Sequence, residues 1–262
     1  MRPLSLHNRE EIAAFLEGNV YRQLYSIGDL DDFFWPYTIW YGSRQHDRLA
    51  AVLLLYIGAS PPVLLAHSDD IVPLKALLSA TLPLLPGRVY AHLDPPLADV
   101  VAARYRLKSH GMHYRMGLAH PGKLKLVETS QVVSLTESQL PAIERLYAEA
   151  YAGNWFDPRM LQTGQYAGIW DGDRLVSIAG IHVYSPRYRV AALGNITTHP
   201  NYRQQGLARA VTAALCNNLL KTVDYIGLNV QTENKGAAAL YAQLGFEVIA
   251  EFGEYMMEAE DL

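Results

Sequence analysis

The chain has 262 residues, of which 50% are hydrophobic and 18% are charged, a composition typical of a globular protein rather than a disordered one. Its net charge is -4 at pH 7 and it has no long basic run, so we expect no nucleic-acid partner. The single cysteine, Cys216, cannot form an internal disulfide, which predicts a reducing, cytoplasmic environment and no Cys/His metal site.

No apolar segment reaches the roughly 20 residues that a membrane-spanning helix requires. The most apolar segments, residues 49–58 and 63–66, are short and interrupted, and we interpret them as buried strands. Arg2, Arg9 and Glu10 stand where a signal peptide would carry its apolar region. We therefore expect neither secretion by that route nor a membrane partner.

Two predicted helices begin with the same capping pattern. Asn8 is followed by Glu11, and Thr136 by Gln139, at the spacing of a capping box. Apolar residues follow each pair at helical spacing. Between the two openings, residues 117–129 show weak apolar periodicity and contain Pro121 and Gly122, as expected of a connector. The sequence therefore predicts two units, residues 1–120 and 125–262.

Internal matches favour a duplicated unit. Asp47-Arg48-Leu49 matches Asp173-Arg174-Leu175, and both triplets lie beside apolar strands. Chance matching of common residues remains the alternative.

The second half alternates strands and helices. We predict strands over residues 165–170, 174–184 and 188–198 as an antiparallel meander, then a helix over 206–220 and a strand over 225–230. A second helix with Leu240, Tyr241 and Leu244 on one face precedes a strand that begins at Phe246. A crossover helix makes strands 188–198 and 225–230 parallel neighbours. The fold class is thus α/β (α+β), with a mixed, mostly antiparallel, twisted sheet flanked by helices in each unit.

The loop of residues 203–208 lies between a predicted strand and a predicted helix. Backbone N–H groups at a helix start lack intrahelical partners, and the helix dipole adds positive potential. Gly206 and Ala208 would let a pyrophosphate approach the backbone, and Arg203 could add a charged contact. A glycine at a helix start for steric reasons alone is the alternative.

Three ordered blocks resemble the GNAT superfamily of acyl-coenzyme A dependent N-acetyltransferases. Residues 203–208 match its loop pattern Gln/Arg-x-x-Gly-x-Gly/Ala. Residues 196–202 resemble the strand end and Pro-x-Tyr-Arg that precede this loop, and Asn234, Leu240-Tyr241 and Gly245-Phe246 resemble the family's downstream signature. The resemblance covers roughly residues 132–257, whereas the first half is only faintly similar. It implies two tandem GNAT-like units, the first a degenerate copy.

The resemblance also implies a cofactor and a site. It implies acetyl-CoA as the acyl donor and no metal, with the pantetheine arm held between two splayed parallel strands. The residues expected to bind the donor are Ile196, Thr197, Thr198, Arg203, Gln204, Gln205, Gly206, Leu207, Ala208, Arg209 and Asn234. Tyr241 matches the family's general acid, which protonates the leaving thiolate; the alternative is that it only packs beside Leu240 and Leu244. Asn234 could equally be a helix N-cap.

The sequence has no match to the carboxylate that serves as general base in many members of the family. No carboxylate occurs in residues 188–198, and Asn229 stands at the later position where many members have Glu. An ordered water, His182 or Glu233 could receive the amine proton. We expect Trp155, Asn195, Asn229 and His182 on the acceptor side, although His182 as a packed strand residue and the loop of residues 155–159 as an ordinary turn are the alternatives.

The first unit lacks the loop chemistry. Its equivalent segment, Ser68-Asp69-Asp70-Ile71, has no glycine and carries two carboxylates where a pyrophosphate needs positive potential. We expect no cofactor there.

These observations predict a cytoplasmic N-acetyltransferase that acetylates the amine of a small-molecule or amino-acid-like acceptor, as a monomer or homodimer. A non-catalytic acyl-CoA-binding or regulatory module is one alternative. A transferase for longer acyl groups, protein N-termini or aminoacyl-tRNA is the other, and the acidic net charge argues against tRNA.

Overall fold

The computed structural model describes residues 2–259, and the chain folds into two compact units. The first unit takes the chain up to Arg115 together with Val230–Glu233 and the segment from Val248 onward. The second takes Met116–Asn229 and Asn234–Glu247. No helix in the part of the chain that the structure describes is long and apolar enough to span a bilayer.

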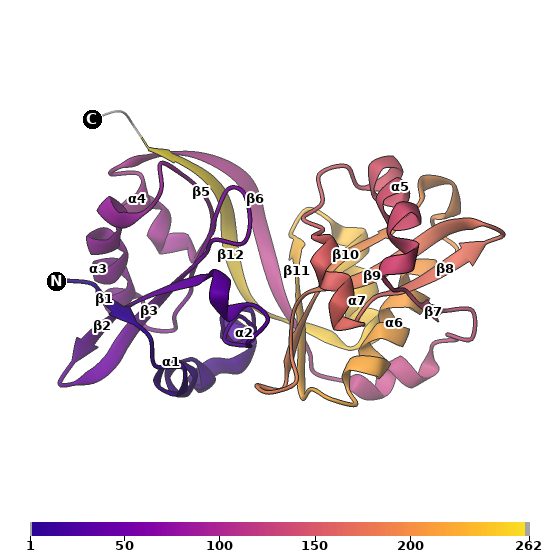
Figure 1. Ribbon diagram of the computed structural model, residues 1–262, viewed down its shortest axis with the longest axis horizontal. Helices are drawn as coiled ribbons and strands as arrows, with labels where there is room; N and C mark the ends of the chain where they lie inside the picture. Colours follow the sequence, from indigo (N-terminus) through magenta and orange to yellow (C-terminus); the bar gives the residue numbers. More distant parts are fainter. Residues whose placement is uncertain (1, 260–262) are drawn as a thin grey trace. The chain divides into compact units, whose positions relative to one another are not determined.

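The first unit carries its helices and strands in the order β1-α1-α2-β2-β3-β4-α3-β5-α4-β6, with β12 added from the end of the chain (Figure 1). The helices are α1 (Arg9–Leu16), α2 (Val20–Gly28), α3 (Ile71–Thr81) and α4 (Ala98–Val101). The strands are β1 (Leu4–Leu6), β2 (Thr38–Gln45), β3 (Arg48–Tyr56), β4 (Val63–Ala66), β5 (Arg88–Leu93), β6 (Tyr105–Leu118) and β12 (Phe246–Ala259).

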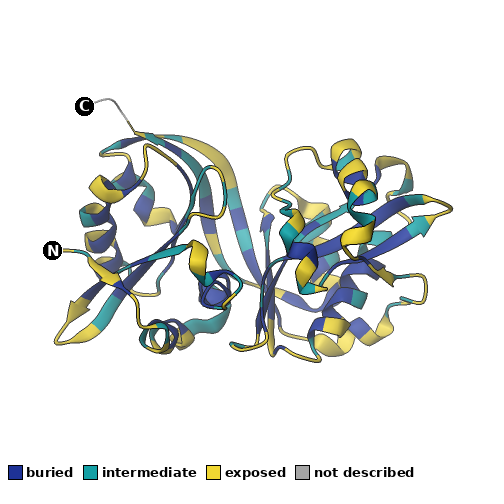
Figure 2. Ribbon diagram, in the orientation of Figure 1, coloured by how far each residue is buried: buried dark blue, intermediate teal, exposed yellow. Residues whose placement is uncertain are grey.

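The first sheet is mixed. β1, β2, β3 and β4 pair antiparallel in turn, β4 pairs parallel with β5, and β5 pairs antiparallel with β12. Alternate residues such as Leu53 and Leu55 of β3 point into a core. The helix α3 closes this core with Leu74 and Leu77, and α4 closes it with Val101. The strands β3, β4 and β5 are mostly buried along their length, whereas β12 also has exposed residues (Figure 2).

The second unit runs β7-α5-β8-β9-β10-α6-β11-α7. Its strands are β7 (Val133–Ser134), β8 (Ala167–Asp171), β9 (Arg174–Ser185), β10 (Val190–Thr198) and β11 (Tyr225–Gln231). Its helices are α5 (Leu140–Ala150), α6 (Leu207–Leu219) and α7 (Lys235–Leu244). As predicted, β8, β9 and β10 pair antiparallel in turn, and β10 pairs parallel with β11. The short strand β7, which was not predicted, pairs antiparallel with β8. α6 packs on β8, β9 and β10 and contacts α7, whereas α5 lies against the other face of β9 and β10 (Figure 1).

Both units are thus mixed, mostly antiparallel sheets flanked by helices, which confirms the predicted fold class. The predicted caps are present as well. Asn8 accepts a hydrogen bond from the N–H of Glu11, and Thr136 and Gln139 form the expected capping box.

The end of the chain differs from the predicted division. The predicted boundary at residues 120–125 assigns the whole chain after it to the second unit. The structure instead pairs β12 with β5 of the first unit, from Gly253 opposite Leu93 to Glu258 opposite Arg88. β12 has 14 residues, far longer than the apolar segment at its start, and only Phe246 and Glu247 group with the second unit. Strand pairing at long sequence separation leaves no local signal in a sequence, so this assignment was not accessible to pattern reading.

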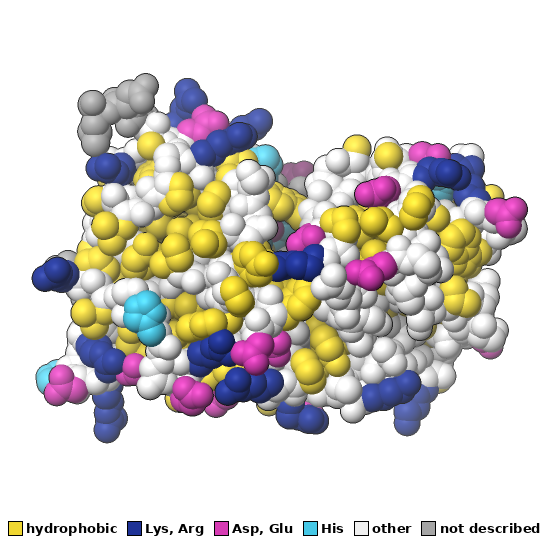
Figure 3. Space-filling view, viewed as in Figure 1, with side chains coloured by type: hydrophobic (Ala, Val, Ile, Leu, Met, Phe, Trp, Pro, Cys, Tyr) yellow, Lys and Arg dark blue, Asp and Glu magenta, His cyan; other side chains and the backbone are white. Residues whose placement is uncertain are grey.

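Charges are mixed on the molecular surface. On the face shown in Figure 3, Lys and Arg side chains lie interspersed with Asp and Glu side chains, and both are separated by apolar side chains. The structure contains exposed ion pairs, such as those of Arg189 with Asp224 and Arg174 with Glu149.

Candidate active site

A fork between two parallel strands is the central feature of the second unit. β10 and β11 pair only from Val190 opposite Tyr225 to Leu193 opposite Leu228. β10 nevertheless continues to Thr198 and β11 to Gln231. Backbone groups of β10 beyond Leu193 therefore have no ladder partner on β11, and an extended ligand can pair with them as an added strand would.

An irregularity in β10 produces this fork. Gly194 lies opposite Gly180 and Thr197 opposite Ile178, so β10 carries one extra residue in this stretch. Asn195 has a φ of 55°, in the left-handed region. Its carbonyl accepts a hydrogen bond of 2.9 Å from the Tyr147 hydroxyl of α5, which holds the bulge.

A helix start with open N–H groups follows β10. Gly206 caps α6 with a φ of 78°, and no side chain of the described chain accepts from the first turn of this helix. A Cβ on Gly206 would meet no described atom within 4 Å, so backbone conformation rather than packing requires the glycine. Residues 203–206 are exposed. The loop has the open N–H groups and the space that a pyrophosphate needs.

The other predicted donor-binding residues surround these two features. Ile196 and Thr197 are half-buried on the unpaired part of β10, whereas Thr198 is buried and its hydroxyl bonds Ser177 at 2.8 Å. The Nε of Arg203 donates to the Thr198 carbonyl at 3.2 Å, which ties the loop to the strand end. Gln204, with a φ of 62°, and Gln205 are exposed in the loop. Leu207, Ala208 and Arg209 form the first turn of α6.

Asn234 acts as an N-cap. Its side-chain oxygen accepts from the Ala237 N–H at 3.1 Å at the start of α7. Asn234 is therefore a helix N-cap, the alternative given for it from the sequence. Its side chain is exposed, and the two N–H groups of the amide can still donate hydrogen bonds to a ligand.

Tyr241 lies in α7 and its side chain is 9% exposed. Burial raises the pKa of its hydroxyl, and Tyr151 and Cys216 add to the effect. The ring packs edge-on against Phe246 at 6.0 Å between centroids. At neutral pH the hydroxyl keeps its proton and can donate it.

The predicted acceptor-side residues differ in exposure. Trp155 is 42% exposed in the loop after α5. His182 and Asn229 are half-buried on β9 and β11. Asn195 is 4% exposed, and its amide donates weakly to the Tyr166 hydroxyl at 3.5 Å. The side chain of Asn195 thus supports the bulge, and only its backbone is placed to face a ligand.

The corresponding strand pair of the first unit has no fork. β4 pairs with β5 over its whole length, from Val63 opposite Tyr90 to Ala66 opposite Leu93. The next N–H, that of Asp94, donates to the Ala66 carbonyl at 3.2 Å. The opening that the second unit offers between its parallel strands is closed here.

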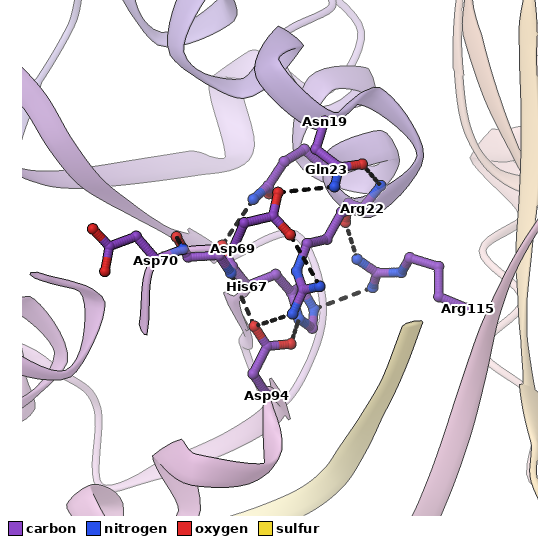
Figure 4. A network of polar contacts seen from close by, with 9 residues as sticks. Asn19, Arg22, Gln23, His67, Asp69, Asp70, Asp94 and Arg115 are labelled. Carbon is purple, nitrogen blue, oxygen red and sulfur yellow. Dashed lines mark hydrogen bonds and ion pairs between the residues drawn. The ribbon is translucent and has the colours of Figure 1, made fainter. Parts of the chain in front are cut away.

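A buried polar network seals this end of the first sheet (Figure 4). The Asp94 carboxylate accepts from the Ser68 N–H, from Nδ1 of His67 and from Arg22, each at 2.9 Å. Arg115 donates to Nε2 of His67 at 3.1 Å, so the His67 proton resides on Nδ1. Gln23 donates to the His67 carbonyl at 2.8 Å.

The network lowers two pKa values, each for a different reason. Burial, helped by Arg115, lowers the pKa of His67 to about 4 despite the neighbouring Asp94. Burial alone would raise the pKa of Asp94, but hydrogen bonds from His67, Ser68 and Arg22 hold it below its usual range. The pair is therefore a neutral imidazole hydrogen-bonded to a carboxylate at neutral pH.

The helix start in the first unit is occupied by the protein itself. Asp70 caps α3 through the Val72 N–H at 3.2 Å, and Asp69 accepts from Asn19 at 2.8 Å (Figure 4). Carboxylates thus fill the position that phosphate oxygens would take. The part of the chain that the structure describes contains no group of three or more His, Cys, Asp or Glu side chains suited to a metal ion.

Sequence reading missed the side chains that support the site. Phe156 was expected only as part of the loop of residues 155–159, and neither Tyr147 nor Tyr166 was assigned to the site. Phe156 lies between them, with centroid distances of 5.0 Å to Tyr147 and 5.8 Å to Tyr166. Asp94, whose N–H extends the pairing of β4 with β5, follows a strand and precedes two prolines, a pattern typical of an ordinary turn.

Comparisons with known proteins agree with this geometry. Residues 131–246 match the Acetyltransferase (GNAT) family. The [Ribosomal protein bS18]-alanine N-acetyltransferase of Escherichia coli (strain K12) is 31% identical over 120 residues, which cover 44% of this chain and 79% of that protein.

Solved structures share the fold over almost the whole chain. An acetyltransferase of the GNAT family from Colwellia psychrerythraea has a TM-score of 0.59 at 12% identity and covers 98% of this chain and 100% of its own. A tandem GNAT protein from the clavulanic acid biosynthesis pathway has a TM-score of 0.58 at 15% identity and covers 100% and 98%. This chain belongs to the GNAT family of acetyltransferases.

Proposed function

We propose that the second unit transfers an acetyl group from acetyl-CoA to the amine of a small-molecule or amino-acid-like acceptor. The observation that carries the proposal is the fork between β10 and β11, which leads directly to the uncapped start of α6. An extended pantetheine arm and a pyrophosphate need these two features in this order along one strand and loop.

In this proposal the donor lies along residues 196–209. The backbone of Ile196, Thr197 and Thr198 pairs with the pantetheine amides, and the N–H groups of Leu207, Ala208 and Arg209 bind the pyrophosphate. Arg203, Gln204 and Gln205 add side-chain contacts, and Gly206 keeps the loop open to the backbone. The free donors of Asn234 contact the donor's pantetheine or phosphate region.

Acetyl-CoA supplies a thioester carbonyl with a thiolate leaving group. A backbone N–H in the unpaired part of β10 stabilises the charge that develops on the carbonyl oxygen. Tyr241 then gives its proton to the departing sulfur. Because burial raises the pKa of this phenol above its ordinary ~10, whereas a thiol has a pKa of ~8.5, the transfer requires the hydroxyl to lie close to the sulfur and well aimed.

The acceptor is proposed to enter from the face that α5 covers. Trp155 is exposed there for contact with the acceptor, and Asn195, Asn229 and His182 lie on the strands beside the fork. No carboxylate occurs on β10, so a conventional acidic base is missing from this strand.

The first unit is proposed to be a degenerate GNAT-like copy that binds no cofactor. Its paired β4 and β5, and the carboxylates at residues 69 and 70, support this assignment. A cytoplasmic location and a monomeric or homodimeric state remain predictions.

Steady-state turnover tests the proposal. The full chain is mixed with acetyl-CoA and a panel of amines, namely free amino acids, amino-acid amides, dipeptides and alkyl or aryl amines, and released coenzyme A is measured. Saturable release that depends on one acceptor class supports the function. Binding of acetyl-CoA without turnover on any amine would instead favour the acyl-CoA-binding module.

A protein acceptor is the second candidate. The relative that shares 31% identity is named for acetylating alanine of a ribosomal protein. Peptides with an N-terminal alanine belong in the same panel, and a preference for peptides over free amino acids would favour this candidate.

A further inference from the structure

Two bulges meet beside the fork. Val183 lies opposite Ala192 and Ile181 opposite Leu193, so His182 is an extra residue in β9. The extra residue in β10 lies just beyond, between Gly194 and Thr197. Bulges are frequent next to active sites. Here one of them places the imidazole of His182 beside the fork.

Gly194 provides the space for this imidazole. A Cβ on Gly194 would lie 2.1 Å from Cδ2 and 2.3 Å from Nε2 of His182, so any larger residue would displace the ring. Gly194 is the first residue of β10 beyond the parallel ladder. The Nε2 edge of His182 thus lies over the backbone at the mouth of the fork.

The ring lies on the acceptor face. Gly194 pairs with Gly180, and directly paired residues face the same side of a sheet. A Cβ on Gly180 would collide with the Tyr166 ring at 2.1 Å, so His182 and Tyr166 share one face. Tyr166 contacts Phe156, which in turn contacts Tyr147 of α5. This is the face opposite α6 and α7 (Figure 1).

Nearby carboxylates already have structural partners. Asp157, the acid next to the aromatic side chains, accepts from the Arg159 N–H at 2.9 Å and contacts its Nε at 3.5 Å. Glu149 of α5 binds Arg174 at 2.6 Å. Glu233 is exposed in the turn before α7. An imidazole, whose ordinary pKa of ~6.5 lies close to neutrality, suits proton removal better than any of these.

We propose that His182 accepts the proton of the attacking amine, a role that rests on the proposed acetyltransferase function. The amine nitrogen bonds to the thioester carbon and the C–S bond breaks. The amine proton passes to the imidazole of His182, and the sulfur takes the phenolic proton of Tyr241. Solvent then returns the proton from His182 to Tyr241. Since α-amino groups have pKa values of ~8 and alkylamines ~10.4, an imidazole base favours α-amines as acceptors.

The test compares His182→Ala with wild type, using the best acceptor of the amine panel. We expect kcat to fall by about 10²-fold or more, with acetyl-CoA binding and the thermal melt nearly unchanged. Removing the ring leaves a space over Gly194, so added imidazole should restore turnover in a saturable way. Tyr241→Phe, which lacks the acid, should gain nothing from imidazole. His120→Ala, an exposed histidine of the same unit, is the matched control and should retain full activity.

The outcomes separate the two claims. If wild type turns over no amine, the proposed function fails before any variant is made. If wild type is active and His182→Ala keeps kcat within about threefold, His182 is not the proton acceptor. A loss of activity that imidazole does not restore also overturns the role, because it assigns His182 to packing or to acceptor placement.

Discussion

Acid should weaken the first unit through its buried histidines. Burial lowers the pKa of His67 to about 4 and, despite Glu254, lowers that of His92 to about 3. Both take up protons near pH 6.5 when the chain unfolds. The unfolded state therefore binds more protons below pH 6.5, and these histidines cost stability as the pH falls. The pKa of Asp94 is lowered as well, but the stability that this carboxylate contributes is lost only below about pH 3.8.

The magnitude follows from the shifts. Between pH 7 and pH 5, an unfolded-state pKa of 6.5 and a folded-state pKa of about 4 remove about 2 kcal/mol from the free energy of unfolding, and His92 removes a similar amount. Asp29 opposes this, since burial raises the pKa of its carboxyl and its folded form keeps a proton that the unfolded form releases. The dependence of the free energy of unfolding on pH in single-residue variants is therefore more informative than its total change in the wild type.

Urea unfolding of wild type and His67→Gln at several pH values between 7 and 4.5 measures these slopes. Below pH 6 the glutamine variant should lose about 1.4 kcal/mol less per pH unit than wild type, because one titrating group is gone. Asp29→Asn should change the slope in the opposite direction. Equal slopes for wild type and His67→Gln would refute the neutral, buried state assigned to His67.

Three further substitutions probe the second unit. Tyr241→Phe keeps the ring, so turnover should fall roughly 10²-fold while calorimetric coenzyme A affinity and the melting temperature hold; full activity would reduce Tyr241 to a packing residue. Tyr147→Phe removes the bond to the Asn195 carbonyl and should cost about 1–2 kcal/mol in urea unfolding, whereas an unchanged midpoint would show that the bulge holds itself. Arg203→Ala should weaken coenzyme A binding about tenfold at low salt and less at high salt; a salt-independent loss would argue against a phosphate contact.

Most of the elements that form the candidate site of the second unit could be predicted from the local sequence. Local signals, such as the glycine at position 206 and the apolar spacing around Tyr241, were enough to predict the helix starts and the parallel pair of strands. The bulges at His182 and Asn195 were not predictable, because a bulge depends on the register between two strands and not on the residues of one. The ring positions over Gly180 and Gly194 depend on that same register.

The first unit also has features that could be predicted from the sequence and features that could not. Asp69 and Asp70 alone predicted that no pyrophosphate binds there. The polar network at the end of the paired strands β4 and β5 could not be predicted in this way. Its members Asp94, His67 and Arg115 lie up to 48 residues apart along the chain and meet only in the folded unit. Contacts of that kind follow from tertiary packing, which single-sequence patterns do not report.

Calorimetric titration with coenzyme A tests the central claim, that a single donor site lies at the fork and helix start of the second unit. Wild type should bind one molecule per chain, and Gly206→Val should abolish binding by blocking backbone approach. Gly164→Val, at a φ of 68° where a Cβ also meets no described atom, is the matched control for backbone strain and should bind normally. Reversing Asp69 and Asp70 to lysine should leave affinity nearly unchanged. Two equal sites per chain, or unchanged binding by Gly206→Val, would contradict the account.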